Sequence, residues 1–443
     1  MKYITLLLCA VLYAISLTTY GQEIYVANDQ QITKRIPPNE ESGILIDNPI
    51  KVGEEVHIPY QNSQLHHVES HMVIHPSNPD HWLVTAMIIT DPVAWNIEAA
   101  VWLTVDAGKN WSRKDFPKIF ADPYLSIDDD GIVYFSGLGQ STKGDNNEYY
   151  YISKDGGKRW SNGQPVEGPH DHPFLITKGK DTFWWSTMKG NRQLNIRKAH
   201  KGEVFQSLKT IHFNDSFRHD NMIPALLGND TLILPFIKYH SSYTGIDVEG
   251  AYFFTTTDGI NIQGPERITN RTGSAKGLES MLVDNSESKY KGNLYFLYPL
   301  GDMRKSEGLE LSISSDGGKL WREVTFRKPE RGKRYYVPTG AINKNGVLGI
   351  YWYEHSESEP FIDNDIFFTV SKDGGKTFIE PVKVNKVTSK LPRTGKDVRV
   401  SRTFPGGGHY SGMKVLPDGS FQMVWSDARS GTYQLYTSNI TIQ

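Results

Sequence analysis

The chain has 443 residues, a formal net charge of −2 and 12% aromatic residues, including 10 Trp and 23 Tyr. A charge so close to zero excludes a general electrostatic attraction to nucleic acid, so we expect no nucleic-acid partner. The aromatic residues favour β-strands over helices, and the 40 Gly and 23 Pro indicate many turns.

Residues 1–21 have the features of a secretory signal peptide. One lysine precedes an apolar run over residues 4–17, and small or polar residues follow it. This order predicts cleavage between Gly21 and Gln22 and a secreted or periplasmic protein. The alternative is a membrane anchor, but the run is short for a span, and no later segment is apolar enough to cross a bilayer. The only cysteine, Cys9, lies in this run, so the mature chain would contain no disulfide.

A turn motif with the pattern Ser/Thr-x-Asp-x-Gly-x-x-aromatic recurs along the chain. In such a turn the aspartate accepts backbone N–H groups, the glycine allows positive φ, and the aromatic side chain packs under the turn. The four clear copies are Thr104–Trp111, Ser153–Trp160, Ser314–Trp321 and Ser371–Phe378. The weaker copies are Thr255–Ile262, Lys198–Phe205 with His200 in the aspartate position, and the C-terminal stretch with Asn439 in that position.

The spacing of these motifs predicts a β-propeller. The aspartate positions lie about 45 to 66 residues apart, which leaves room for four short strands in each repeat. We therefore predict an all-β, seven-bladed propeller with four-stranded antiparallel blades, formed by one domain over residues 22–443. The last repeat lacks a fourth strand, which the segment Glu23–Pro59 would supply. Six blades are the alternative, because the His200 and Asn439 copies match the pattern poorly.

The four clear copies resemble the Asp-box, or BNR, repeats of the secreted sialidase-like β-propellers, and the likeness covers most of the mature chain. The resemblance implies the same propeller fold. It does not imply one activity, because Asp-box propellers include hydrolases, lyases and binding proteins.

In such a blade, the start of the innermost strand, the end of the second strand and the links between blades share one face, opposite the Asp-box turns. Two basic segments, Arg327–Arg334 and Lys386–Arg402, lead onto this face and suit an anionic ligand. The ionisable residues predicted on this face are His66, His67, Glu69, His71, Asp91, Asp122, His170, Asp171, His172, Lys189, Arg192, Arg218, His219, Asp220, Lys238, His240, Glu279, Arg304, Glu354, His355, His409, Asp427 and Arg429.

The hairpin Phe217–His240 resembles the His-Asn-x-Pro-type hairpin of propellers that include the ulvan lyases. The resemblance implies that His219 and His240 form a catalytic pair that acts with a tyrosine and an arginine. The candidate catalytic residues are His219, His240, Tyr298 and Tyr239. The candidates for substrate binding are Arg218, Arg304, His172, Lys238, Arg192, Trp185 and His409.

These residue types suit β-elimination on an anionic, uronic-acid-containing polysaccharide or oligosaccharide. A cation neutralises the sugar carboxylate, a histidine or tyrosine removes the C5 proton, and an acid protonates the group that leaves C4. The enzyme would be a lyase if that group is a sugar and a dehydratase if it is a hydroxyl. No cofactor is required, but a divalent metal such as Ca²⁺ or Zn²⁺ could take part, with His170 and His172 on one side of a strand as ligands.

Two other functions are open on the sequence alone. A sialidase-type hydrolase would need three arginines and a Tyr–Glu pair, for which Arg218, Arg304, Arg429, Tyr353 and Glu354 are candidates. A non-catalytic propeller would bind glycans through exposed aromatic residues such as Trp95. In each case we expect a monomer without a transmembrane segment.

Overall fold

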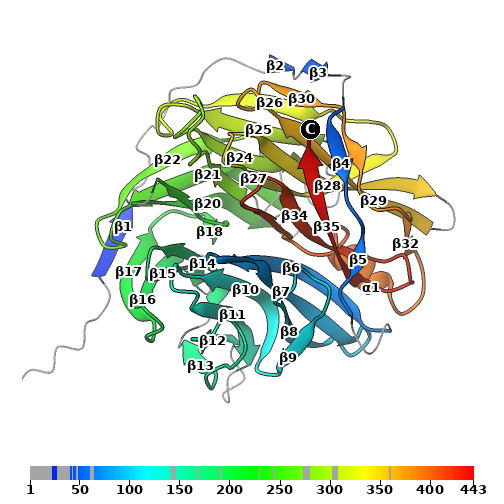
Figure 1. Cartoon of the computed structure of the whole chain (residues 1–443). Coiled ribbons are helices and arrows are strands. Elements are labelled where there is room, and N and C mark those ends of the chain that lie inside the picture. The colour runs from blue at the N-terminus through cyan, green and yellow to red at the C-terminus, as the bar shows by residue number, and fades with distance from the viewer. Residues whose placement is uncertain are drawn as a thin grey trace, which may run out of the picture.

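Short strands separated by tight turns follow one another and pair into antiparallel sheets, as the turn motifs predict. The computed structural model describes residues 22–26, 40–41, 43–45, 48–59, 64–140, 146–166, 168, 170–188, 190, 192–228, 230–242, 245–272, 280–301, 308–358 and 361–443. Seven sheets of four or five strands surround a central axis (Figure 1), which confirms the predicted all-β, seven-bladed propeller, and a further two-stranded sheet lies beside them.

Blades 1 to 3 follow in chain order, and in each the first strand lies nearest the axis. Blade 1 comprises β6 (His66–His75), β7 (Asn78–Asp91), β8 (Asn96–Thr104) and β9 (Ser112–Phe116). Blade 2 comprises β10 (Ile119–Ile127), β11 (Val133–Gln140), β12 (Asn146–Ser153) and β13 (Gln164–Val166). Blade 3 comprises β14 (His170–Lys178), β15 (Asp181–Met188), β16 (Gln193–His200) and β17 (Gln206–Phe213).

Blades 4 to 6 repeat this order with small interruptions. Blade 4 comprises β18 (Arg218–Asn221), β19 (Ala225–Leu227), β20 (Thr231–Ser242), β21 (Gly245–Thr256) and β22 (Gln263–Thr269). Blade 5 comprises β23 (Ser280–Val283), β24 (Leu294–Leu300), β25 (Gly308–Ser314) and β26 (Arg322–Arg327). Blade 6 comprises β27 (Lys333–Ile342), β28 (Leu348–Ser358), β29 (Phe361–Ser371), β31 (Val382–Lys383) and β32 (Ser389–Pro392). Between β29 and β31, β30 (Thr377–Ile379) belongs to the separate two-stranded sheet.

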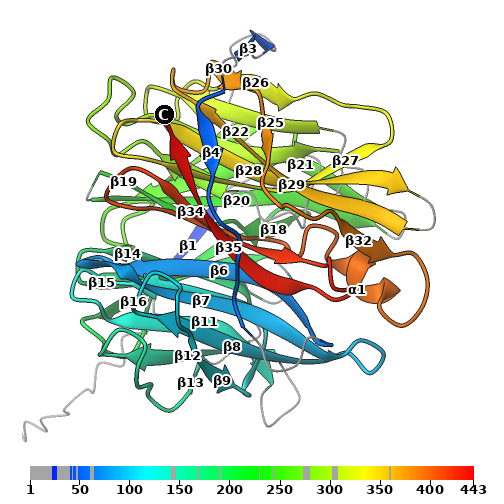
Figure 2. The same ribbon diagram turned by 45° about the vertical axis from the view of Figure 1, so that its right-hand side comes forward.

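The N-terminal segment supplies the outer strand of blade 7. The other strands of this blade are β33 (Gly412–Val415), β34 (Phe421–Asp427) and β35 (Gln434–Ile442). The strands β4 (Ile50–Val52) and β5 (Val56–His57) pair with β35, and Figure 2 shows β4 alongside it. Earlier in the chain, β1 (Gln22–Val26), β2 (Glu40–Glu41) and β3 (Gly43–Leu45) pair in parallel with β17, β26 and β30. These additions cover outer edges that would otherwise expose unpaired backbone groups.

The Asp-box turns have the contacts that the motif predicts. Ser153 Oγ donates a hydrogen bond to Asp155 Oδ1 at 2.9 Å, and Gly157 N donates to Ser153 Oγ at 2.8 Å. Asp155 Oδ1 also accepts Arg159 N at 2.8 Å, and Trp160 Nε1 donates to Gly157 O at 2.9 Å. The serine or threonine and aspartate contacts recur in the other clear copies. Each turn is therefore held by its own residues.

The weaker copies differ from one another. Thr256 Oγ1 donates to Asp258 Oδ1 at 3.1 Å, so this copy keeps the motif. His200 instead lies 2.7 Å from Asp181 of the neighbouring strand. Asn439 lies inside β35, so the prediction of a turn motif at this position is wrong. The pairing of β35 with β4 holds this part of the chain extended.

We expect the melting temperature to fall steeply between about pH 4 and about pH 2. Hydrogen bonds from Asn110 lower the pKa of the Asp106 carboxyl to about 2. Burial opposes the charge of Asp155, but hydrogen bonds from Arg159 and Ser153 lower its pKa to about 2. The unfolded value is about 3.9, so this stabilisation is complete above that pH and is lost as the pH falls through 2. Thermal melts over this range test it, and Asp155→Asn should show a shallower slope.

Candidate active site

Four innermost strands contain a bulge at an equivalent point near their start. At these bulges Glu69, Asp122, His172 and Val337 have φ of 57°, 50°, 53° and 52°, and the strand register shifts beside each of them. Left-handed backbone costs a non-glycine residue about 1 kcal/mol or more. A bulge also turns a side chain away from the normal alternation of the strand. In three of the four strands, the side chain that is turned in this way is ionisable.

A proline follows the bulged residue in three of these strands. It comes directly after Asp122, His172 and Val337 but not after Glu69. Proline disfavours right-handed helical backbone in the residue before it and favours extended backbone there, so it is compatible with a bulge but does not by itself predict positive φ. Sequence analysis placed Glu69 and Asp122 on the site face but did not include them among the candidate site residues.

Glu69 lies near the start of β6 and His409 lies just before β33, and the two form a pair although they come from opposite ends of the chain. The region where the innermost strands begin, with Glu69, Asp122, His172 and His409, is called the mouth. His409 Nδ1 lies 3.0 Å from Glu69 Oε1, and the His409 side chain is 18% exposed. Glu69 is 1% exposed, and its backbone N donates to Gly407 O at 2.8 Å. A Cβ on Gly408 would lie 2.6 Å from Glu69 N, so only glycine allows this approach. The Glu69 carboxylate therefore holds the His409 ring in place through its Nδ1 atom.

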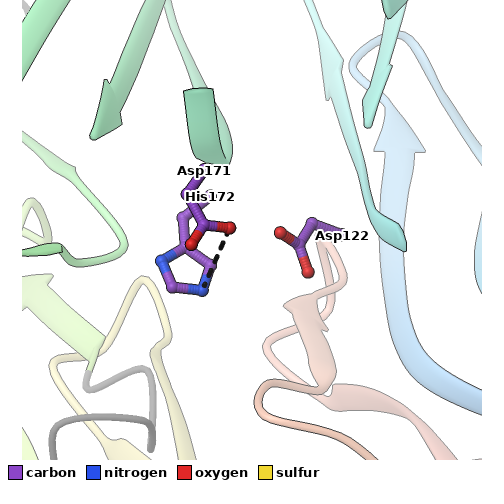
Figure 3. A group of neighbouring side chains, drawn as sticks. All are labelled: Asp122, Asp171 and His172. Carbon is purple, nitrogen blue, oxygen red and sulfur yellow. Dashed lines mark ion pairs between the residues drawn. The ribbon is translucent and has the colours of Figure 1, made fainter. Parts of the chain in front are cut away.

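Asp122, Asp171 and His172 bring their ligand atoms within 4.8 Å of one another (Figure 3). His172 Nδ1 lies 3.0 Å from Asp220 Oδ1, which also accepts the Thr187 hydroxyl at 2.9 Å. The Asp122 residue is 7% exposed, whereas the Asp171 side chain is 49% exposed. This group is the set of described side chains that could hold a metal. It includes His172 of the predicted pair, and the role of His170 stays a prediction because its side chain lies outside the described residues.

Carboxylates outnumber imidazoles at the mouth. Burial raises the pKa of the Asp122 carboxyl well above its usual range, and the charge of Glu69 raises it further. Burial alone would lower the pKa of His172, but the charges of Asp171 and Asp220 outweigh burial and raise it well above the usual value. The site is therefore rich in carboxylates. Its surroundings favour the protonated forms of Asp122 and His172, which lower the net negative charge of the site.

The hairpin Phe217–His240 presents two different sides. Arg218 pairs with Tyr239 and His219 with Lys238, so alternation places Arg218, Asp220 and Tyr239 on one side. His219 lies on the other side, where it is fully buried and stacks on Phe213 with ring centroids 3.6 Å apart.

His240 shares that second side but is exposed at the surface. Its ring stacks on Phe217 at 3.9 Å. Lys238 Nζ and His219 Nε2 lie 3.1 Å and 3.3 Å from Asp215 Oδ2. The structure thus places the two histidines in different environments, and their catalytic role stays a prediction.

We expect His219→Ala to lower the free energy of unfolding by about 2 kcal/mol, because it leaves a cavity beside Phe213. His240→Ala should change it by less than about 0.5 kcal/mol, because His240 is exposed. Urea denaturation of both variants measures the difference. Equal midpoints for the two variants would contradict the burial of His219.

The other candidate residues lie in several places. Tyr298 is fully buried in blade 5 and donates to Glu310 Oε2 at 2.8 Å. Trp185 is fully buried in the core of blades 3 and 4, and its Nε1 donates to Pro235 O at 3.1 Å. Arg192 is exposed on the link before β16. The described residues do not include Lys189, Glu279, Arg304 or the side chain of His170.

The residues considered for sialidase-type hydrolysis make structural contacts. Arg429 Nη2 lies 2.7 Å from Glu55 Oε1 and 2.6 Å from Asp427 Oδ2. Tyr353 is fully buried, and its hydroxyl accepts a hydrogen bond from Ser426 N at 3.0 Å. The Arg429 interactions lie within blade 7, and the Tyr353 contact links blade 6 to blade 7.

The basic side chains of the two segments Arg327–Arg334 and Lys386–Arg402 contact different kinds of groups. In the first, Arg327 and Lys333 lie 2.9 Å and 2.6 Å from the carboxylate of buried Glu354. The second folds into β32 and the helix α1 (Val398–Thr403) beside blade 1. There the Arg399 guanidinium lies 3.9 Å from the centroid of the Trp95 ring. Phe404, which follows α1, packs against both Trp95 and His409, with ring centroids 6.3 Å and 5.2 Å apart, so the second segment leads to the surroundings of His409.

Comparison with known proteins supports the fold alone. No family model and no curated protein matches the chain. A protein of unknown function from Dyadobacter fermentans is similar in structure, with a TM-score of 0.50, 13% identity, and coverage of 89% of this chain and 100% of that one.

Two further solved structures align less well. An α-L-arabinanase of Penicillium chrysogenum gives a TM-score of 0.46, 12% identity, and coverage of 88% of this chain and 98% of that one. An intramolecular trans-sialidase of Ruminococcus gnavus gives a TM-score of 0.44, 12% identity, and coverage of 85% of this chain and 94% of that one.

The described residues contain no helix with the length and hydrophobicity that a membrane crossing requires.

Proposed function

We propose that the protein is a carbohydrate-active enzyme that cleaves a uronate-containing glycan by β-elimination at the channel mouth. The observation that carries this proposal is the Glu69–His409 pair, in which a buried carboxylate fixes a partly exposed imidazole. Histidine is the side chain best suited to take up a proton near neutral pH, and a carboxylate partner orients its ring. His409 is therefore assigned as the base that removes the C5 proton.

The group that leaves C4 needs a proton donor. Tyr239 lies on the same side of its hairpin as Asp220, and burial raises the pKa of its hydroxyl, with the charge of Asp220 adding to the effect. A tyrosine that stays protonated can donate a hydrogen bond or a proton to an oxygen. Tyr239 is therefore the candidate acid.

The sugar carboxylate needs a cation. Arg218 is exposed and stands opposite Tyr239 in the hairpin, and a guanidinium can bind a carboxylate through two hydrogen bonds. The basic segment that contains α1 adds positive charge on the other side of the mouth. These features support an anionic substrate in spite of the carboxylates of the centre.

The experiment is incubation with uronic-acid polysaccharides and their oligomers, followed by the ultraviolet absorbance of a new C4–C5 double bond. The proposal predicts a rising signal on at least one uronate. The absence of signal on every uronate, together with cleavage of another glycan, would overturn it.

Hydrolysis is a second candidate because the carboxylates of Asp122 and Asp171 lie close together, one buried and one half-exposed. Retaining glycoside hydrolases use two carboxyl groups about 5 Å apart. The same incubations separate the two reactions, since hydrolysis creates reducing ends without the ultraviolet signal.

A further inference from the structure

The group of Asp122, Asp171 and His172 has a spacing that a cation can bridge. His172 Nε2 lies 4.0 Å from Asp171 Oδ1, which is too long for a hydrogen bond. Two atoms that each lie about 2 Å from one metal ion are themselves roughly 3 to 4 Å apart. Figure 3 shows the Asp122 carboxylate facing the other two side chains across this space.

His172 is oriented as a metal-binding histidine would be. Its Nδ1 lies 3.0 Å from Asp220 Oδ1, so the ring can donate the Nδ1 proton to that carboxylate. The Nε2 atom then faces the group, and a metal ion that binds there would displace the proton from this atom. A carboxylate that orients the far side of a histidine ring is a common partner of metal ligands and raises their basicity.

Asp122 provides an independent observation. The residue is 7% exposed, and within the described chain its Oδ2 atom has no hydrogen-bond partner. A buried carboxylate oxygen without a partner is costly, and the nearby carboxylates of Glu69 and Asp171 increase the cost. A bound cation would give this oxygen a partner and offset the repulsion.

The backbone fixes two of the three ligands in advance. Asp122 and His172 both lie at left-handed bulge positions of neighbouring blades. Strained backbone of this kind is retained where it positions functional groups. The two side chains therefore meet without a rearrangement of their strands.

We propose that Asp122, Asp171 and His172 bind a divalent transition-metal cation such as Zn²⁺ or Mn²⁺. Imidazole with carboxylates favours these ions, whereas Ca²⁺ and Mg²⁺ prefer oxygen ligands alone. Three protein ligands leave coordination positions open, and the half-exposed Asp171 marks the side from which a further ligand enters.

A bound cation would also offset the negative charge of the carboxylates at the mouth. The carboxylates of Glu69, Asp122, Asp171 and Asp220 would repel a uronate, and a bound cation would attract its carboxylate group instead. This role toward the sugar rests on the proposed function. Binding of the metal ion does not rest on it.

The test uses tag-free protein that has been treated with a chelator and then dialysed. Calorimetric titration and thermal melts with Zn²⁺, Mn²⁺, Ca²⁺ or Mg²⁺ alone should show one equivalent of Zn²⁺ or Mn²⁺ bound and a higher melting temperature. Calcium and magnesium should bind at least about tenfold more weakly. Asp171→Asn, His172→Gln and Asp220→Asn should each weaken binding by about tenfold or more.

The matched control is Asp230→Asn, because Asp230 is an exposed aspartate on the turn before β20, at the opposite edge of its blade. It should bind the metal as the unchanged protein does. Absence of Zn²⁺ and Mn²⁺ binding at millimolar concentration would overturn the proposal. Binding that persists in both Asp171→Asn and His172→Gln would overturn it as well.

Two features keep the test decisive. Asp171 is half-exposed, so its replacement keeps the ligand set testable even if Asp122→Asn fails to fold. No glycan is present in the binding assay. Metal binding without cleavage of any uronate would therefore refute the proposed function alone. Cleavage by metal-free protein would refute only the role of the cation toward the sugar, and the binding measurements alone decide whether the metal site exists.

Discussion

Replacing His409 with glutamine is expected to lower kcat/KM on a uronate glycan by about 10³-fold, with little change in melting temperature. Glutamine can keep a hydrogen bond to Glu69 Oε1, but it cannot take up a proton near neutral pH. Removal of a general base costs about 10² to 10⁴ in rate. Initial rates from the ultraviolet absorbance, together with thermal melts, measure both quantities.

The matched control for His409 is His200→Gln. His200 also contacts an aspartate through Nδ1, at 2.7 Å from Asp181, but it lies at the edge of blade 3 where the Asp-box turns are found. This variant should keep the full rate. The variant His240→Gln tests the hairpin that the sequence highlighted. If His240→Gln loses the rate and His409→Gln keeps it, the base belongs to the hairpin and our assignment is wrong.

Replacing Arg429 with methionine is expected to lower the free energy of unfolding by about 3 kcal/mol. The guanidinium lies between Glu55 and Asp427, and both carboxylates are buried. Methionine keeps much of the side-chain volume but leaves two carboxylates without a cation, although each keeps hydrogen bonds from other groups such as Lys386 N and Ser389 Oγ. Urea denaturation followed by tryptophan fluorescence measures the change.

The Arg429 interaction also links the N-terminal segment to blade 7, because Glu55 directly precedes β5. The control is Arg159→Met, which breaks an exposed ion pair with Asp155 and should cost less than about 1 kcal/mol. Combining Arg429→Met with Glu55→Gln and Asp427→Asn should restore part of the lost stability, because no buried charge is then left unpaired. Equal unfolding midpoints for Arg429→Met and Arg159→Met would contradict this account.

The sequence was sufficient for the propeller because its signals are local. Each Asp-box turn is held by contacts within eight consecutive residues, as between Ser153 and Trp160. The strands around it alternate or run apolar over short lengths, which is also a local property. The Asn439 copy was misread because only part of the motif is present there, and pairing of β35 with β4 from the other end of the chain keeps this residue in a strand.

The hairpin Phe217–His240 shows where local reasoning ends. Antiparallel geometry correctly brings the ends of the hairpin together, and strand alternation places His219 and His240 on the same side. Phe213 of the preceding blade covers that side, because it stacks on His219 and buries it. Burial by a neighbouring blade has no signature in the hairpin itself.

The sequence by itself determined the repeat, the turn chemistry and the face on which acid and base residues gather, because these follow from contacts between near neighbours in the chain. Only the tertiary structure decided which of them meet. Glu69 and His409 become partners when the first and last blades close the ring. Asp122 of blade 2 approaches His172 of the neighbouring blade 3. Left-handed backbone at the strand starts aims these side chains into one space, and such strain persists only because the packed ring around it holds it.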